Sequence, residues 1–151
     1  MRLLTPSFVA LFVAASTAMG CSSMTAGPTS PSGGGGSTAL TADQIAGTLS
    51  LVSIQPAGQA EQAVPAGATY TLALADGRAS TRADCNMCNG AFAVSGQTLT
   101  IGPLLACTRA ACPTMDFESA YVTLLAGESA VRIDAASVAL SSSRGVLRFR
   151  R

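Results

Sequence analysis

The chain has 151 residues and a formal net charge of +1, and it contains no histidine. All nine basic residues are arginines, because the sequence has no lysine. The lack of histidine removes the commonest general base of enzymes and the commonest metal ligand. Apart from Arg2, eight arginines balance eight acidic residues. No basic stripe suits a nucleic acid, so we expect no nucleic-acid partner.

The first twenty residues have the features of an export signal. Arg2 supplies a positive charge, and residues 8–15 form an apolar run shorter than the roughly 20 residues that span a bilayer. The following Ala18-Met-Gly-Cys21 resembles the lipobox of bacterial lipoproteins, whose cysteine receives the lipid. We predict a lipoprotein signal peptide over residues 1–20 and lipidation at Cys21. The alternative is cleavage by an ordinary signal peptidase, which would leave Cys21 as a free thiol.

Residues 21–40 have the composition of a flexible tether between this anchor and the rest of the chain. Ser22 to Thr38 contain no charged residue and include four consecutive glycines at 33–36. A coil of roughly 20 residues spans about 25 Å. We therefore expect a protein held by lipid in the bacterial cell envelope. In a cell with an outer membrane, the expected location is that membrane, facing the periplasm, because Ser22 is not the aspartate associated with retention at the inner membrane.

Residues 41–151 are predicted to form one domain that is mainly β. Asp76-Gly77 is typical of a hairpin turn, Asn89-Gly90 predicts a second turn, and the Pro- and Gly-rich residues 55–67 predict a loop. A bulge is expected before Ile54. The apolar and polar alternation predicts short strands over 48–54, 70–74, 78–82, 91–94, 98–101, 129–133, 137–140 and 146–150.

One amphipathic helix is predicted near 114–126. Its apolar residues recur with the helical period at Phe117, Tyr121, Leu124 and Leu125. Thr114 precedes this stripe as the expected N-cap, and Gly127 follows it. A capping-box pattern at residues 41–44 predicts one further turn of helix. Many short strands with one helix favour a small antiparallel barrel or a rolled sheet.

Four cysteines form two close pairs, Cys85 with Cys88 and Cys107 with Cys112. Their spacing is near that of a zinc ribbon, and the first pair also has the spacing of a redox motif. Export favours disulfides over zinc. A redox pair should open a helix, whereas Cys88 is followed by a predicted turn and strand. Two structural disulfides are therefore favoured, and all three pairings remain open.

The remaining polar clusters do not favour catalysis. Asp84 beside Arg82, and Asp116 near Glu118, stand at starts of elements where acidic residues are usually solvated or capping. We expect no catalytic residue, no cofactor and no metal site. A last cluster consists of Arg148, Arg150 and Arg151, which is more typical of a solvated strand face than of a contact with lipid phosphates.

The order of these landmarks resembles the META domain family, the HslJ type of bacterial envelope protein. The resemblance rests on residues 47–54, 70–78, 83–86, 99–103, 107–113 and 145–149. It implies a barrel-like fold with a helix between the cysteine region and the last strands, and an exported, often lipid-anchored protein. It also implies the pairing Cys85–Cys112 with Cys88–Cys107 nested inside. Two departures are Leu49, where the family has tryptophan, and Asp84, where it has glycine.

The predicted function is a non-catalytic binding, structural or stress-related role at the cell envelope. Beside the membrane, the expected partner is an envelope protein or peptide, which the Asp76-Gly77 turn and residues 55–67 would contact, and we expect a monomer. The alternative is a thiol-based redox or zinc-binding protein that uses Cys85, Cys88, Cys107 and Cys112.

Overall fold

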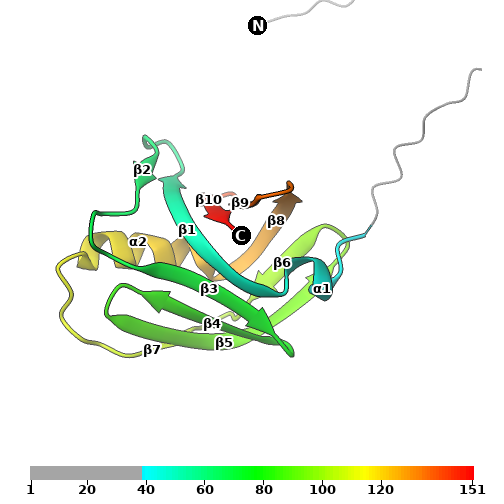
Figure 1. The fold of residues 1–151 in the computed structure, drawn as a ribbon, viewed down its shortest axis with the longest axis horizontal. Helices are drawn as coiled ribbons and strands as arrows, with labels where there is room; N and C mark the ends of the chain where they lie inside the picture. The colour runs from blue at the N-terminus through cyan, green and yellow to red at the C-terminus, as the bar shows by residue number, and fades with distance from the viewer. Residues whose placement is uncertain (1–38) are drawn as a thin grey trace, which may run out of the picture. The chain divides into compact units, whose positions relative to one another are not determined.

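The computed structural model describes residues 39–151. The predicted signal peptide, Cys21 and nearly all of the predicted tether lie outside the described residues. None of the helices within 39–151 has the length and apolar character to span a membrane. The elements, shown in Figure 1, are α1 (Ala42–Ile45), β1 (Gly47–Pro56), β2 (Gln62–Ala63), β3 (Tyr70–Ala75), β4 (Arg78–Ala83), β5 (Asn86–Ser95), β6 (Thr98–Ile101), β7 (Ala106–Cys107), α2 (Met115–Leu125), β8 (Gly127–Ile133), β9 (Ser137–Ser142) and β10 (Gly145–Arg150).

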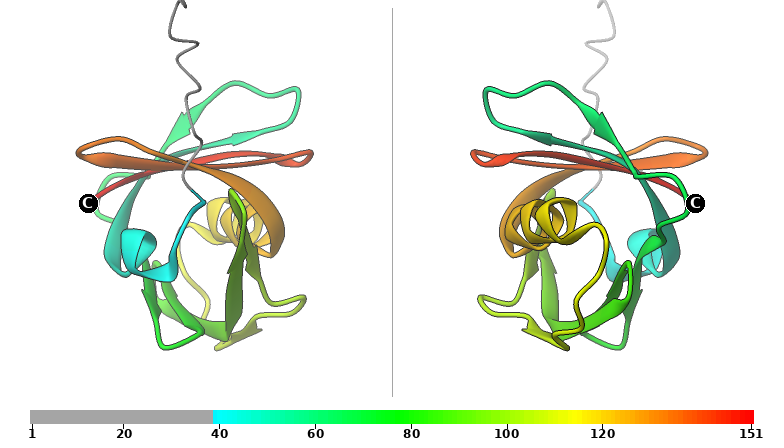
Figure 2. Two further views of the ribbon diagram at one scale, coloured as in Figure 1. Left: turned by 90° about the vertical axis from the view of Figure 1, so that its right-hand side faces the viewer. Right: turned by 90° about the vertical axis from the view of Figure 1, so that its left-hand side faces the viewer.

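Eight of the strands form a closed antiparallel barrel. The strands follow one another around the barrel in the order β1, β3, β4, β5, β6, β8, β9 and β10, and β10 pairs with β1 to close the ring. The short strands β2 and β7 pair with β1 and β5 outside this ring. The mainly β fold and the small antiparallel barrel predicted from the sequence are thereby confirmed (Figure 2).

Strand β1 closes the barrel because it pairs with β3 along its first residues and with β10 along the rest. Residues 47–50 pair with β3, and residues 50–56 pair with β10. The register with β10 shifts between Leu51 and Ser53, which confirms the bulge expected before Ile54. At the far end Gly145 lies opposite Pro56 with φ of 145°, and a Cβ there would overlap the Gln55 carbonyl oxygen. Glycine is therefore required where β1 and β10 meet.

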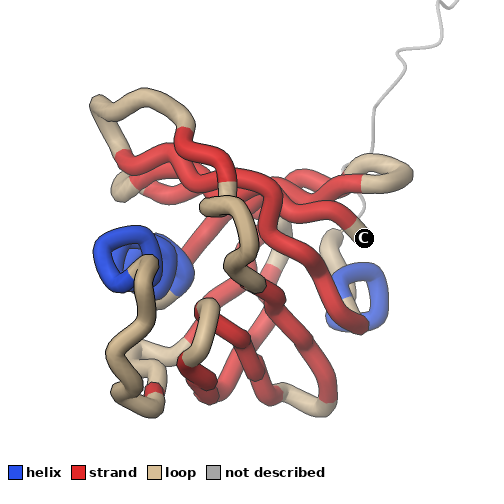
Figure 3. The backbone as a smooth tube through the Cα atoms, turned by 60° about the vertical axis from the view of Figure 1, so that its left-hand side comes forward, coloured by secondary structure: helices blue, strands red, loops and turns tan. Residues whose placement is uncertain are grey.

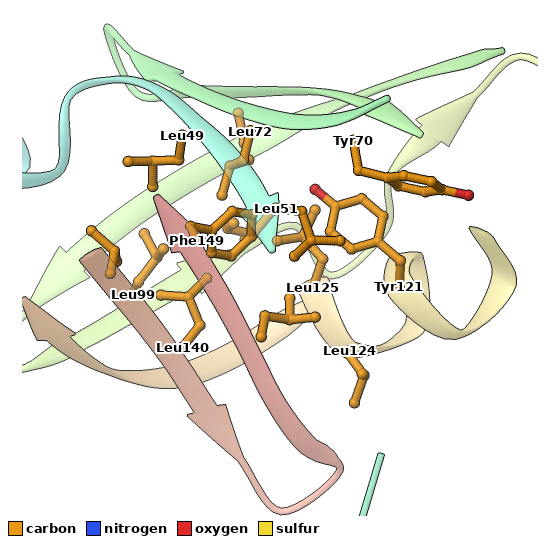
Figure 4. Close-up of a cluster of buried hydrophobic side chains, with 14 of the residues drawn as sticks. Leu49, Leu51, Tyr70, Leu72, Leu99, Tyr121, Leu124, Leu125, Leu140 and Phe149 are labelled. Atoms are coloured by element: carbon orange, nitrogen blue, oxygen red, sulfur yellow. The ribbon is translucent and has the colours of Figure 1, made fainter. Parts of the chain in front are cut away.

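Large side chains fill the interior of the barrel (Figure 4). The predicted helical stripe is confirmed, since Phe117, Tyr121, Leu124 and Leu125 are the buried residues of α2. Helix α2 packs against β1, β4 and β10, and Figure 3 shows α1 and α2 on opposite sides of the barrel. Tyr70 makes edge-to-face contacts with Phe117 and Tyr121, with ring centroids 5.0 and 5.3 Å apart.

Two local predictions were wrong. Asn89-Gly90 does not turn, because β5 runs without a break from Asn86 to Ser95. A Cβ on Gly90 would lie 2.7 Å from Leu105 Cδ2, so this glycine lets the following connection approach the strand. Residues 55–67 are not wholly a loop, since they contain the short strand β2.

Candidate functional site

The four cysteines lie at one corner of the barrel, where β5 begins. Cys85 is bonded to Cys112 with Cα atoms 5.8 Å apart, and Cys88 is bonded to Cys107 with Cα atoms 4.0 Å apart. Cys88 and Cys107 also face each other in the ladder between β5 and β7. The bonds close loops with sequence separations of 27 and 19. By the chain-entropy estimate, loops of this size stabilise a fold by about 3 to 4 kcal/mol each, although nested loops are not additive.

The buried side chain of Asn86 also joins the connection between β7 and α2 to the barrel. Its Oδ1 accepts hydrogen bonds from the Ala110 N–H at 2.7 Å and the Thr108 hydroxyl at 2.9 Å. Its Nδ2 donates to the Ala110 carbonyl at 3.0 Å and to both carboxylate oxygens of Glu118 at 3.0 Å. Nδ2 also lies 3.2 Å from Cys112 Sγ. The Asn86 side chain thus ties together β5, the loop after β7 and helix α2.

Sequence analysis did not identify Asn86 as a site residue. Asn86 lies in a strand, where asparagine is uncommon. Only 1% of this residue is exposed. A buried amide must find partners for its donors and acceptors. Asn86 lies between the predicted strands 78–82 and 91–94, so its place next to Cys85 was the only local signal that could have revealed this contact.

Thr114 has a different role from the predicted one. It occupies the N-cap position of α2, but its side chain makes no capping hydrogen bond. Its hydroxyl donates to Asp84 Oδ2 at 2.7 Å. A hydroxyl has one proton, so Tyr70 must be the donor in the 2.7 Å contact between the Tyr70 and Thr114 oxygens. Asp84 is held at φ of 55°, a conformation that glycine adopts at less cost.

Burial raises the pKa of Tyr70, and the nearby carboxylates of Asp84 and Glu118 act in the same direction. Tyr70 therefore remains a neutral donor to Thr114 at neutral pH. Because the folded-state pKa is raised above the ordinary tyrosine value of 10.0, the stability linked to this phenol is fully present below that pH. It is lost as the pH rises toward the folded-state value.

The acidic residues that the sequence analysis interpreted as solvated or capping have different surroundings in the structure. Arg82 Nε donates to the backbone oxygen of Asp84 and not to its carboxylate. Glu118 accepts from Asn86, whereas Asp116 is exposed elsewhere on α2. The four sulfur atoms of the corner are bonded in pairs and offer no thiolate to a metal. Within residues 39–151, no three histidine, cysteine or acidic side chains gather as metal ligands.

Three surface clefts adjoin helix α2. A cleft of about 470 Å³ separates α2 from residues 62–65. A second, of about 410 Å³, lies between α2 and residues 107–111, and a third, of about 510 Å³, lies beside residues 56–57 and Arg144. We call the α2 residues that line these clefts the α2 surface, namely Met115, Asp116, Phe117, Glu118, Ser119, Ala120, Val122, Thr123 and Leu124.

The two predicted contact segments lie in different places. Part of the 55–67 segment forms the wall of two clefts beside the α2 surface. The Asp76-Gly77 turn instead lines a cleft of about 290 Å³ with α1 and Phe92. Asp76 and Gly77 both have positive φ, at 49° and 71°, as the predicted hairpin turn requires.

A family model described as "META domain" matches residues 40–151. A search of curated proteins finds no match. An NMR structure of a protein from Burkholderia xenovorans is 29% identical with a TM-score of 0.59, covering 69% of this chain and 80% of that one. A second NMR structure is 20% identical with a TM-score of 0.59, covering 74% of this chain and 94% of that one.

A third solved structure is a crystal structure of a lipocalin-like protein from Bacteroides uniformis. It is 16% identical with a TM-score of 0.49, and the match covers 72% of this chain and 98% of that one. The two NMR structures share the fold of this chain.

Replacing Asn86 tests whether its side chain holds the corner together. Asn86→Asp places a buried carboxyl against the half-buried Glu118, which raises the pKa of the new group. Its penalty is therefore greatest near neutral pH, at about 3 kcal/mol, and shrinks as the pH falls toward 4. Denaturant unfolding of the two proteins from pH 4 to 8 measures this dependence.

The matched control is Asn89→Asp, which changes an exposed residue of the same strand. We expect it to alter the free energy of unfolding by no more than about 0.5 kcal/mol. Equal, pH-independent effects of the two substitutions would show that Asn86 does not hold the corner.

Proposed function

Because the chain belongs to the META domain family, we propose that it is an envelope lipoprotein that works by binding an envelope protein or peptide and not by catalysis. Its role is then structural or stress-related, as the family resemblance implies. The observation that carries the proposal is the α2 surface, on which three clefts adjoin one helix.

The walls of the α2 surface are held in place before any partner arrives. On one side, residues 107–112 are fixed by two disulfides and by Asn86. On the other side, the segment containing β2 is paired to β1 at Ser53 and Ile54. Ser53 donates a hydrogen bond to Glu61, which also forms a salt bridge with Arg148 at 3.2 Å. Preformed walls reduce the entropy that binding must overcome.

The chemistry of the α2 surface suits a polypeptide. Met115 is 53% exposed, and a flexible thioether adapts to irregular apolar partners. Val122 adds a half-buried apolar contact in the same cleft. Arg109 and Arg144 stand on opposite sides of the helix, with Asp116 near its start. An apolar strip with charged residues at its rim is the usual composition of a protein interface.

Catalysis has less support from the same residues. The cysteine sulfurs are bonded in pairs, and the buried tyrosines donate to threonine side chains inside the fold. Burial raises the pKa of Tyr121, so this phenol stays protonated at neutral pH and supplies no phenolate to act as a base. The redox and zinc alternatives both require free thiols, so they apply only to a reduced form of the corner.

The envelope location is proposed from the sequence before the described residues. The apolar run ending in Ala18-Met-Gly-Cys21 supports lipidation. The following tether of roughly 20 residues would hold the barrel some 25 Å from the bilayer. In this arrangement the barrel remains a monomer and reaches partners at the membrane surface, in the periplasm where the cell has an outer membrane.

Lipidation is tested by phase partitioning in a bacterial host. We expect the unmodified chain to enter the detergent phase, because two or more acyl chains make a durable anchor. Cys21→Ser should stay in the aqueous phase while its barrel remains folded. Identical partitioning of the two proteins would contradict the anchor without affecting the binding proposal.

Binding at the α2 surface is tested by photo-crosslinking in cells. A photoreactive amino acid in place of Ser119, which lines two of the clefts, should capture one discrete partner. The same replacement at Ser95, an exposed residue at the end of β5, should not. Adding Met115→Glu should reduce capture at position 119 about tenfold, as expected for loss of one interface anchor.

Two results would contradict this assignment. Equal capture from positions 119 and 95 would indicate a nonspecific contact. Capture at position 119 that survives Met115→Glu unchanged would place the partner away from the clefts.

A further inference from the structure

The geometry points to a second interaction surface: we propose that the outer face of β8, β9 and β10 binds the phosphate headgroups of an anionic lipid bilayer. The residues that carry it are Arg132, Arg148 and Arg150, which we call the arginine face. This surface is separate from the α2 surface.

The strand register brings the three arginines together. Ala139 in β9 lies opposite Arg132 on one side and Arg148 on the other. Residues directly opposite in neighbouring strands share a face of the sheet, so these two arginines flank one alanine. Neighbouring strands are about 4.8 Å apart, which puts their Cα atoms about 10 Å apart. Arg150 follows two residues after Arg148 on the same face.

The floor between the arginines consists of small residues. Ser137 and Ser50 lie opposite Arg150 in β9 and β1, and Ala139 separates the other two arginines. All three guanidinium-bearing side chains are exposed. Short neighbours leave the arginines uncovered, and the Ser50 hydroxyl can donate to the same anion. Guanidinium groups bind phosphate in a bidentate manner.

Among the described residues, acidic side chains neutralise only one of the three arginines. Glu61 forms its salt bridge with Arg148. Asp134, two residues after Arg132, accepts a hydrogen bond from Ser137. Within the described chain, no salt bridge joins Arg132 or Arg150 to an acidic residue. Like charges placed close together on one face destabilise a sheet. An external anion would relieve that repulsion.

Arg132 is the residue that changes the interpretation of this cluster. The sequence groups Arg148, Arg150 and Arg151, which alone are typical of a solvated strand face. In the structure the Arg151 guanidinium donates to the Gln44 carbonyl, so it is already occupied. Arg132 arrives from β8 and extends the charge across three strands. A flat patch of this width suits a surface of many phosphates better than one small ion.

A lipid surface is the source of phosphate that the chain's own organisation favours. This step rests on the proposed anchor, whose tether holds the barrel close to a bilayer. Each arginine near an anionic membrane strengthens association about fivefold. Three such contacts give weak binding from solution that is measurable at low salt, and they would orient a domain that is already tethered.

The experiment is co-sedimentation of the full chain carrying Cys21→Ser, which removes the anchor, with vesicles. Vesicles of equal parts phosphatidylglycerol and phosphatidylcholine are compared with vesicles of phosphatidylcholine alone, at about 50 mM and about 500 mM salt. We expect binding only to the anionic vesicles at low salt. Arg132→Gln with Arg150→Gln should weaken it about 30-fold, and Glu61→Gln should strengthen it about fivefold by freeing Arg148.

The matched control is Arg78→Gln with Arg82→Gln, which makes the same change in net charge on β4. Strand β4 lies four strands from β9 in either direction around the barrel, so its outer face points the opposite way (Figures 2 and 3). This control should retain the original binding, and thermal unfolding should show every variant folded.

Equal weakening by both double substitutions would overturn the proposal, because it would mean that net charge alone drives association. Binding to phosphatidylcholine alone, or no binding to anionic vesicles, would also overturn it. Since the tested chain lacks the anchor residue, none of these results depends on lipidation or on the α2 surface.

Discussion

The structure depends on how the start of β5 is fastened to the connection between β6 and α2. Cys85, just before β5, and Cys88, within β5, each form a disulfide with this connection. Asn86, which lies between these two cysteines, forms hydrogen bonds with Ala110 and Glu118. A connection of this length outside a barrel would otherwise be one of the least stable parts of a fold. The disulfides and the buried hydrogen bonds of Asn86 together fix the conformation of this connection. Helix α2 follows directly after it.

Under the proposed function, this corner lets the chain present a binding surface outside a filled barrel. The interior is filled by residues such as Leu72, Ile54 and Phe149, so contacts must be made outside. The α2 surface lies between the fastened loop and the segment containing β2, whereas the arginine face lies on β8 to β10. A tethered domain could therefore face the membrane with one side and meet a partner with another.

Much of the barrel could be predicted because its signals are local. The Asp76-Gly77 turn, the strand alternation and the stripe of α2 each follow from neighbouring residues. The errors arose where distant residues decide the outcome. Asn89-Gly90 has the sequence of a turn, but its glycine instead makes room for Leu105. Thr114 has the sequence of a cap, but Asp84 takes its hydroxyl proton. The partners of Asn86 come from two later segments, which no local pattern could reveal.

Hydrogen exchange before and after reduction of the disulfides tests the central role of this corner most directly. With the disulfides reduced, residues 105–113 and helix α2 should lose protection, while β8, β9 and β10 should keep it, because their pairing does not involve the corner. The chain without reduction should protect both regions. Unchanged protection of α2 after complete reduction would contradict the account, and so would loss of protection to the same extent throughout the barrel.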